Sequence, residues 1–250
     1  MTSRKEELGQ IHSIVSANPK NTNRETRIRF WSLVRDIKRE HTHNDEEILL
    51  AASIRDLLFD ASRGRTFSLR PTLALQFSLG ILLAVIPYLY SLTLHLDWGL
   101  IFIWSLSDWG IFSLRFLTVF LGVAVFYPIG RLIGARYTGI KLTGVCRDQY
   151  YEPTLRIDYV SFLQATPAKR KWFFFIAGIW TIITSLIFWI VGFAIAGDFT
   201  GLIPAIPLFF LEGYVIFSGK SSHTGGEMGH YNREKKIERV WKEKGKEKGI

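Results

Sequence analysis

Four long apolar stretches interrupt a chain that is otherwise rich in charge. They run over about residues 72–94, 111–137, 172–196 and 199–218. Each holds about the 20 residues that a helix needs to cross the roughly 30 Å hydrocarbon core of a bilayer. The pattern therefore predicts an all-α membrane protein with four transmembrane helices.

Lys and Arg residues gather in three segments of the chain. Residues 1–70 hold 13 of them, residues 131–171 hold 8 and residues 219–250 hold 9, whereas 95–110 and 197–201 hold none. Cytoplasmic loops next to membrane helices collect Lys and Arg. The distribution predicts a multi-pass protein of the cell (cytoplasmic) membrane with both termini in the cytoplasm.

The first 70 residues are expected to form a cytosolic helical segment. Residues 1–23 are polar and are predicted to be a mobile arm. Residues 24–40 favour an amphipathic helix, because they carry apolar side chains at helical spacing, namely Ile28, Trp31, Val34 and Ile37. A second helix is predicted to start at Asn44, where Glu47 three residues on completes a variant of the capping box.

Two further soluble segments complete the predicted order. Alternating apolar residues over about 139–159 favour a short cytoplasmic β-hairpin between the second and third spans. Residues 219–250 are Gly-rich and then Lys/Glu-rich, which predicts a basic cytosolic tail ending in an exposed, partly frayed helix. The expected order is a helical segment (1–70), a four-helix membrane domain (71–218) and this tail.

The net charge of +9 limits the class of partner. A basic chain attracts nucleic acid or an anionic surface. Here the basic residues flank apolar spans, where each gains roughly 1 kcal/mol from anionic lipid headgroups, and the sequence has no groove-reading or base-stacking motif. The expected partner is therefore the lipid bilayer and not nucleic acid, with a membrane or cytoplasmic protein as a second candidate.

The most informative motif lies at the cytoplasmic end of the second span. Residues 127–140 read YPIGRLIGARYTGI. This segment resembles the H-E-x-G-H-x-x-x-A-R-x-x-G-I motif of the site-2 protease family of intramembrane zinc metallopeptidases. Tyr127 and Arg131 stand at the two histidine positions, and Pro128 stands at the position of the general-base glutamate. The matching positions are Gly130, Ala135, Arg136, Gly139 and Ile140.

The downstream layout is similar to that family as well. The expected hairpin is followed by Ala177-Gly178, and Leu211-Glu212-Gly213 stands where the family has a zinc-binding L-D-G segment. The run at residues 217–222 (FSGKSS) and the proline after the first motif position are similar to a set of uncharacterised prokaryotic membrane proteins related to the family. The resemblance implies a site-2-protease-like helical core over about residues 110–220.

The residues that perform the family's chemistry are missing. Arginine stays protonated in proteins and cannot bind a cation, and proline has no acid or base function. The run at residues 226–230 (GEMGH) is interpreted as a chance likeness to the motif, because it lacks a first histidine and an apolar helical context. No catalytic residue, metal or cofactor is therefore predicted.

Glu212 is predicted to form an ion pair. A carboxylate within a membrane span is costly unless it finds a partner, and Arg131 and Arg136 stand at motif positions that the resemblance places near it. Pairing would join the second span to the fourth and keep a cross-link where the family holds zinc. The alternative is that Glu212 lies high enough to reach the cytoplasmic interface.

Glycine and proline in the second span predict its packing and shape. Gly122, Gly130 and Gly134 are expected to allow close approach of a neighbouring helix. Pro128 has no amide hydrogen to donate to Ala124 and is expected to bend the helix.

These observations favour a non-catalytic binding or regulatory protein. It would hold a partner, for example through a strand added to the edge of the hairpin. The alternative is a membrane-embedded, metallopeptidase-like hydrolase with a non-standard site, which stoichiometric zinc would favour. A transporter is disfavoured, because Glu212 is the one ionisable residue deep enough to line a path.

Overall fold

The computed structural model describes residues 3–41, 44–63, 65–147, 153–219 and 226–247. The chain divides into two compact units, each assembled from separate segments. The first, here called the polar unit, comprises Met1–Leu69, Ala135–Phe173 and His230–Ile250. The second, here called the apolar-helix unit, comprises Arg70–Gly134 and Phe174–Gly229.

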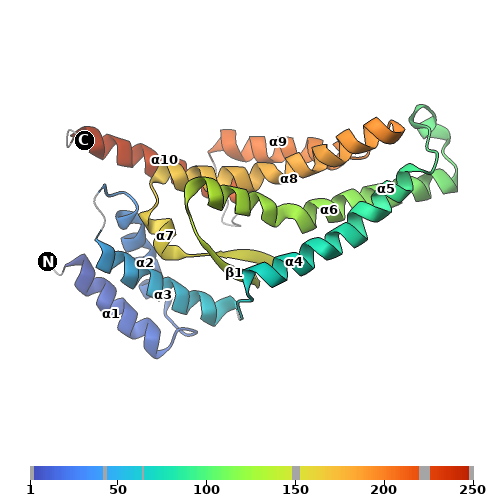
Figure 1. The fold of residues 1–250 in the computed structure, drawn as a ribbon. Coiled ribbons are helices and arrows are strands. Elements are labelled where there is room, and N and C mark those ends of the chain that lie inside the picture. Colours follow the sequence, from blue (N-terminus) through green and yellow to red (C-terminus); the bar gives the residue numbers. More distant parts are fainter. Residues whose placement is uncertain (1–2, 42–43, 64, 148–152, 220–225, 248–250) are drawn as a thin grey trace. The chain divides into compact units, whose positions relative to one another are not determined.

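The polar unit begins with three helices, α1 (Arg4–Ala17), α2 (Arg24–Ile37) and α3 (Asp45–Arg63) (Figure 1). The prediction of a mobile arm over residues 1–23 is wrong, because Ser3 and Glu6 form a capping box that starts α1. Buried apolar residues of α1, namely Leu8, Ile11 and Val15, hold it in the unit, and α1 packs against α3. Three apolar residues at helical spacing in a short, otherwise polar segment are a weak signal, which explains why the sequence pattern missed this helix.

Helix α2 forms where the sequence predicts it, although with a rotated buried face. Asn23 caps its first turn by accepting a hydrogen bond from the Thr26 amide at 2.7 Å. Val34 and Ile37 are buried as expected, together with Phe30 and Leu33. Ile28 and Trp31 are instead 59 % and 44 % exposed. The helix therefore presents apolar side chains on both its inner and outer faces.

The predicted hairpin is present in the polar unit. Strands β1 (Leu142–Arg147) and β2 (Pro153–Ile157) pair antiparallel, and helix α7 (Tyr159–Gln164) follows. The other edge of β1 contacts Phe67, whose amide donates to the Val145 carbonyl at 2.7 Å and whose carbonyl accepts from the Val145 amide at 2.9 Å. This edge of the hairpin is therefore already paired at Val145.

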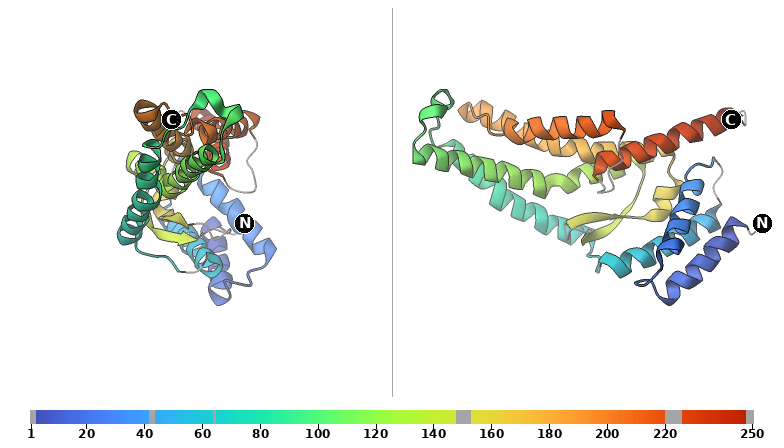
Figure 2. Two further views of the ribbon diagram at one scale, coloured as in Figure 1. Left: turned by 90° about the vertical axis from the view of Figure 1, so that its right-hand side faces the viewer. Right: turned by 180° about the vertical axis from the view of Figure 1, so that it is seen from behind.

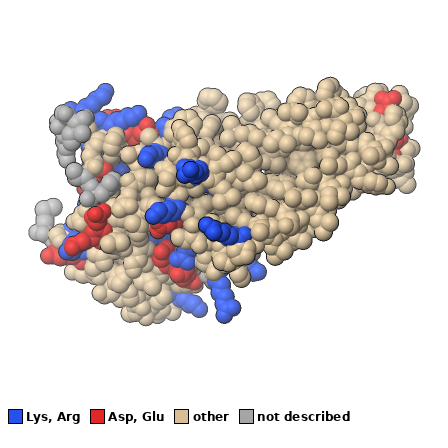
Figure 3. All heavy atoms as spheres, viewed as in Figure 1, with Lys and Arg blue, Asp and Glu red and all other residues tan. Residues whose placement is uncertain are grey.

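The apolar-helix unit contains the larger part of the long apolar helices, whereas residues 135–138 and 167–173 at their ends belong to the polar unit. A first helical run joins α4 (Leu69–Gly80), the π-helical turn η1 (Ile81–Val85) and α5 (Ile86–Leu92). The elements that follow it are the 3₁₀ segment η2 (Trp98–Ile103), α6 (Leu106–Thr138), α8 (Pro167–Ala196) and α9 (Leu202–Ser218). Within the described residues, three helices are long and apolar enough to cross a membrane, namely Leu69–Leu92, Leu106–Thr138 and Pro167–Ala196. Helix α9 is apolar but has only 17 residues. On the face drawn in Figure 3, the surface of these helices is almost free of charged side chains.

Close packing joins the helices of this unit. A Cβ atom at Gly122 would lie 2.5 Å from the Phe188 ring, and one at Gly130 would lie 2.4 Å from Trp180 Cβ, so both glycines of α6 face α8 at short range. Helix α9 turns back along α8 (Figure 2), and Ser185 Oγ of α8 donates to the Gly201 carbonyl at 2.6 Å. Gly134 is also buried.

Helix α6 continues through Pro128 without a break in its helical assignment. Side chains of neighbouring helices supply donors to carbonyls beside the proline: Gln76 Nε2 donates to the Val125 carbonyl at 2.9 Å and Trp180 Nε1 to the Phe126 carbonyl at 3.1 Å. Pro128 removes the donor to the Ala124 carbonyl, and these two side-chain donors bind the next two carbonyls of the same turn.

The last described element is α10 (Glu227–Glu247). Its first three residues belong to the apolar-helix unit and the remainder to the polar unit. The expected exposed tail helix instead has a buried face that includes Met228, Glu234 and Ile237. Three of its acidic residues, Glu227, Glu234 and Glu238, form salt bridges with other segments.

Candidate functional site

Tyr127 and Arg131 of the altered motif lie one turn apart on α6 and face the same carboxylate. That carboxylate belongs to Glu227, the first residue of α10. Arg131 Nε donates to Glu227 Oε1 at 2.7 Å, and Arg131 Nη2 lies 2.5 Å from the same oxygen. The Tyr127 hydroxyl also donates to Glu227 Oε1. Residues at i and i+4 share a helix face, which is why the motif spacing brings both groups to one point.

This cluster, here called the motif cluster, is largely shielded from solvent. The side chains of Arg131 and Glu227 are 14 % and 7 % exposed, and the Arg131 guanidinium carbon lies 5.5 Å from the centre of the Tyr127 ring. Glu227 Oε2 is buried and has no hydrogen-bond partner among the residues that the structure describes. Charge compensation by Arg131 and the donors on Oε1 therefore stabilise the carboxylate, together with its position in the first turn of a helix.

The structure differs from the ion pair expected for Glu212. The carboxylate beside Arg131 is Glu227, and the described part of the chain contains no ion pair of Glu212 with Arg131 or Arg136. Glu212 lies in α9 and is partly buried. Arg136 is exposed and belongs to the polar unit. The sequence interpretation dismissed residues 226–230 as a chance likeness without a helical context, whereas Glu227 is the first residue of α10, a helix that the pattern placed in solvent.

The chemistry available to the motif cluster is electrostatic. Arg131 cannot give up its proton to bind a metal, and the described residues contain no group of three or more His, Cys, Asp or Glu side chains that could hold a metal ion. Pro128 is buried and offers neither a donor nor a base. Tyr127, Arg131 and Glu227 together can cross-link α6 to the start of α10 and keep the position electrically compensated.

A second buried charge cluster lies elsewhere in the apolar-helix unit. Arg115 of α6 and Asp198, in the connection between α8 and α9, are 1 % and 0 % exposed and form a salt bridge of 3.1 Å. Asp198 also accepts from the Tyr88 hydroxyl at 2.8 Å and the Thr200 hydroxyl at 2.7 Å. Arg115 donates to the carbonyls of Ser91 and Leu94. In the sequence, each of these two charges stands alone in a segment that is otherwise free of charge. That isolation is the signal from which the pair could have been predicted.

A third cluster holds α10 in the polar unit. Arg170 Nε donates to Glu234 Oε2 at 2.8 Å, and Lys38 Nζ pairs with the other carboxylate oxygen. Arg170 is fully buried and also donates to the Lys38 carbonyl at 3.0 Å. Burial alone would raise the pKa of Glu234, but the positive charges of Lys38 and Arg170 outweigh it and lower this pKa below its ordinary value.

Comparison with family models, curated proteins and solved structures gives no match to this chain. The resemblance to the site-2 protease family therefore rests on the sequence motif and the downstream layout, and no comparison supports it.

Proposed function

We propose that this chain is a non-catalytic binding or regulatory protein of the cytoplasmic membrane, with a site-2-protease-like core. The observation that carries the proposal is the motif cluster. At the positions where the family motif has zinc-binding histidines, Tyr127 and Arg131 both engage the Glu227 carboxylate. A permanent cation at this point repels a metal ion, and zinc needs three or four neutral or anionic ligands.

We further propose four crossings with both termini in the cytoplasm. The segments of the polar unit correspond closely to the three Lys/Arg-rich segments of the sequence. Arg170, at the start of α8, pairs with Glu234 of α10, which requires both on one side of the bilayer. Because α8 leads away from that side, α9 has to cross back, and 17 residues are at the lower limit of what a span needs.

A metal assay tests the absence of a zinc site. Chain purified in mild detergent is expected to contain far less than one zinc per molecule by elemental analysis. Arg131→Gln removes the cation. It is expected to leave the zinc content unchanged, because position 131 is only one of the motif positions at which the family's residue is missing. One zinc per chain that disappears in Glu212→Gln would support the hydrolase and overturn this proposal.

Helix α2 supplies a candidate surface for a protein partner. Ile28 and Trp31 are exposed on its outer face, and aromatic side chains are enriched at protein interfaces. On the β1 side of the hairpin, where a strand could have been added, Phe67 already pairs with Val145, so the α2 surface is a second candidate beside the hairpin. We propose that a membrane or cytoplasmic protein binds here.

Site-specific photo-crosslinking in cells tests that surface. A photoreactive amino acid at position 31 is expected to give a discrete crosslinked protein species. Position 36, on the same helix but at a half-exposed aspartate, serves as the matched control and is expected to give none. Equal crosslinking at both positions, or none at position 31, would reject α2 as the partner surface.

A further inference from the structure

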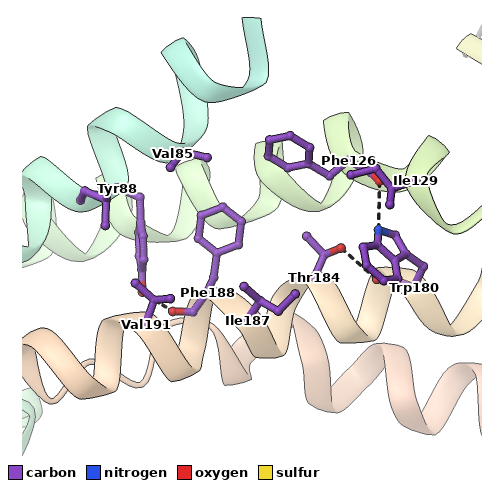
Figure 4. Close-up of a pocket in the computed structure, with 10 residues that line it drawn as sticks. Val85, Tyr88, Phe126, Ile129, Trp180, Thr184, Ile187, Phe188 and Val191 are labelled. Atoms are coloured by element: carbon purple, nitrogen blue, oxygen red, sulfur yellow. Dashed lines mark hydrogen bonds between the residues drawn. The ribbon is translucent and has the colours of Figure 1, made fainter. Parts of the chain in front are cut away.

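An apolar groove opens within the apolar-helix unit (Figure 4). Its volume is about 210 Å³, and its walls come from the first helical run, α6 and α8. The floor is formed by Tyr88, Thr184 and Phe188, which are buried. At the mouth lie Leu89, Ile187 and Val191, which are exposed.

The polar atoms of the lining residues are already engaged in hydrogen bonds. The Tyr88 hydroxyl donates to Asp198 and also lies 3.0 Å from the Phe188 carbonyl. The Thr184 hydroxyl donates to the Trp180 carbonyl, and Trp180 Nε1 donates to the Phe126 carbonyl. A water in the groove would need two or more polar partners to be stable. The groove is therefore suited to a hydrocarbon ligand.

The surrounding helices cannot close the groove by moving together. Gly122 and Gly130 of α6 already lie at contact distance from Phe188 and Trp180 of α8. Gly80, just before the π-helical turn η1, is equally tight against Val125, and Val85 of that turn lines the groove. Close-packed contacts on these sides leave the space between them fixed.

We propose that this groove binds one hydrocarbon chain of a membrane lipid. The inference rests on the proposed insertion of the apolar helices in the bilayer, but not on the absence of catalysis. The mouth residues are apolar and exposed on helices apolar enough to span a membrane, so the hydrocarbon of the bilayer is the medium that meets them. A chain entering from that side replaces an empty apolar space with dispersion contacts.

Photolabelling from within the bilayer tests the proposal. The full chain is reconstituted in phosphatidylcholine vesicles that contain a phosphatidylcholine with a diazirine on its acyl chain. Floor residues Tyr88 and Phe188 are shielded by protein, so they are labelled only if an acyl chain enters the groove. Ile190, exposed on α8, reports contact with bulk lipid.

Paired variants separate the groove from the lipid-facing surface. Val85→Phe, which fills the groove, is expected to lower floor labelling about tenfold, equivalent to roughly 1.4 kcal/mol of binding. Leu83→Phe, an exposed neighbour in η1 outside the lining, is expected to leave it unchanged. Val191→Phe and Ile190→Phe provide a second pair on α8 in case one variant fails to fold.

The possible results distinguish the two proposals. Labelling of Ile190 without the floor residues would overturn the groove while leaving membrane insertion intact. Floor labelling that is the same in Val85→Phe and Leu83→Phe would also overturn the groove. Absence of label at both Ile190 and the floor would overturn insertion and the groove together.

Discussion

Each strongly buried charge of the described residues is compensated by specific neighbours. Arg115 is matched by Asp198, Arg170 by Glu234, and Arg131 by Glu227. Breaking one partner of a buried pair costs about 3–5 kcal/mol, because the other charge is left without compensation. These residues should therefore dominate the effects of single substitutions on stability.

The motif cluster gives a prediction that separates the two candidate carboxylates of Arg131. Glu227→Gln and Arg131→Gln are each expected to reduce the free energy of unfolding by about 3 kcal/mol. The double variant is expected to lose clearly less than the sum, because neither charge is then left alone. Thermal unfolding in detergent measures the three values.

Glu212→Gln is the matched control for that cycle. Glu212 lies in the same unit, but the salt bridge of Arg131 is with Glu227, so Glu212→Gln is expected to be close to neutral and to show no favourable coupling with Arg131→Gln. Strong coupling of Glu212 with Arg131, together with additive effects of Glu227 and Arg131, would show that the sequence-based assignment was correct.

At the residue scale, the sequence identified the right arginine but not its partner. Tyr127 and Arg131 were singled out because they stand at the two histidine positions of the family motif, and both do reach one carboxylate. The partner is 96 residues away along the chain, beyond what local spacing encodes. The cost of a carboxylate in a membrane span suggested that Glu212 needs a partner, and the family resemblance supplied Arg131 as that partner.

At the element scale, apolar helices were more predictable than polar ones. Length and hydropathy located the three long helices and the shorter α9, because burial in hydrocarbon requires continuous apolar runs. Helices α1 and α10 escaped recognition as packed elements. Their buried faces use few apolar residues and, in α10, acidic residues that are buried only because Arg170, Lys38 and Lys171 neutralise them.

Docking of α10 on the polar unit is expected to depend on pH through Glu234. Its folded-state pKa lies below the ordinary value of 4.5, so the ionised form stabilises the fold above that value. This stabilisation begins to decrease when the pH falls below about 4.5, the ordinary pKa of the carboxyl. It is lost once the pH has fallen past the lowered pKa of Glu234 in the folded state. Glu234→Gln is expected to cost about 3–5 kcal/mol near pH 7, because it leaves Arg170 and Lys38 uncompensated.

The difference between the wild-type chain and Glu234→Gln should therefore shrink as the pH falls below 4.5. Unfolding midpoints measured from pH 7 to pH 3 would show it. Glu243→Gln is the matched control on the same helix, since Glu243 is exposed and pairs only at i,i+4 spacing with Arg239; such a pair contributes about 0.3–0.5 kcal/mol. A difference that stays constant over the whole pH range would contradict the assigned role of Glu234.

At the scale of the whole molecule, three distant segments of the sequence form one unit. The polar unit combines the N-terminal helices, the hairpin region and the C-terminal helix. The Lys/Arg counts predicted that these segments share one side of a membrane, but charge counts carry no information on whether they pack together. Their assembly depends on side-chain pairs such as Arg170 with Glu234 and Lys38 with Glu234, which only a three-dimensional structure identifies.

The proposed topology gives the last prediction, and α9 decides it. Single cysteines are placed at the exposed positions Ser107, Lys141 and Lys244 in a Cys146→Ser background, and intact cells are treated with a membrane-impermeant maleimide. Position 107 is expected to react, whereas positions 141 and 244 are expected to react only after the cells are lysed. If α9 fails to cross, position 244 would react in intact cells, and Arg170 could not reach Glu234 from the opposite side of the bilayer. Reaction at position 141 but not at 107 would instead invert the whole orientation and contradict the charge asymmetry on which it is based.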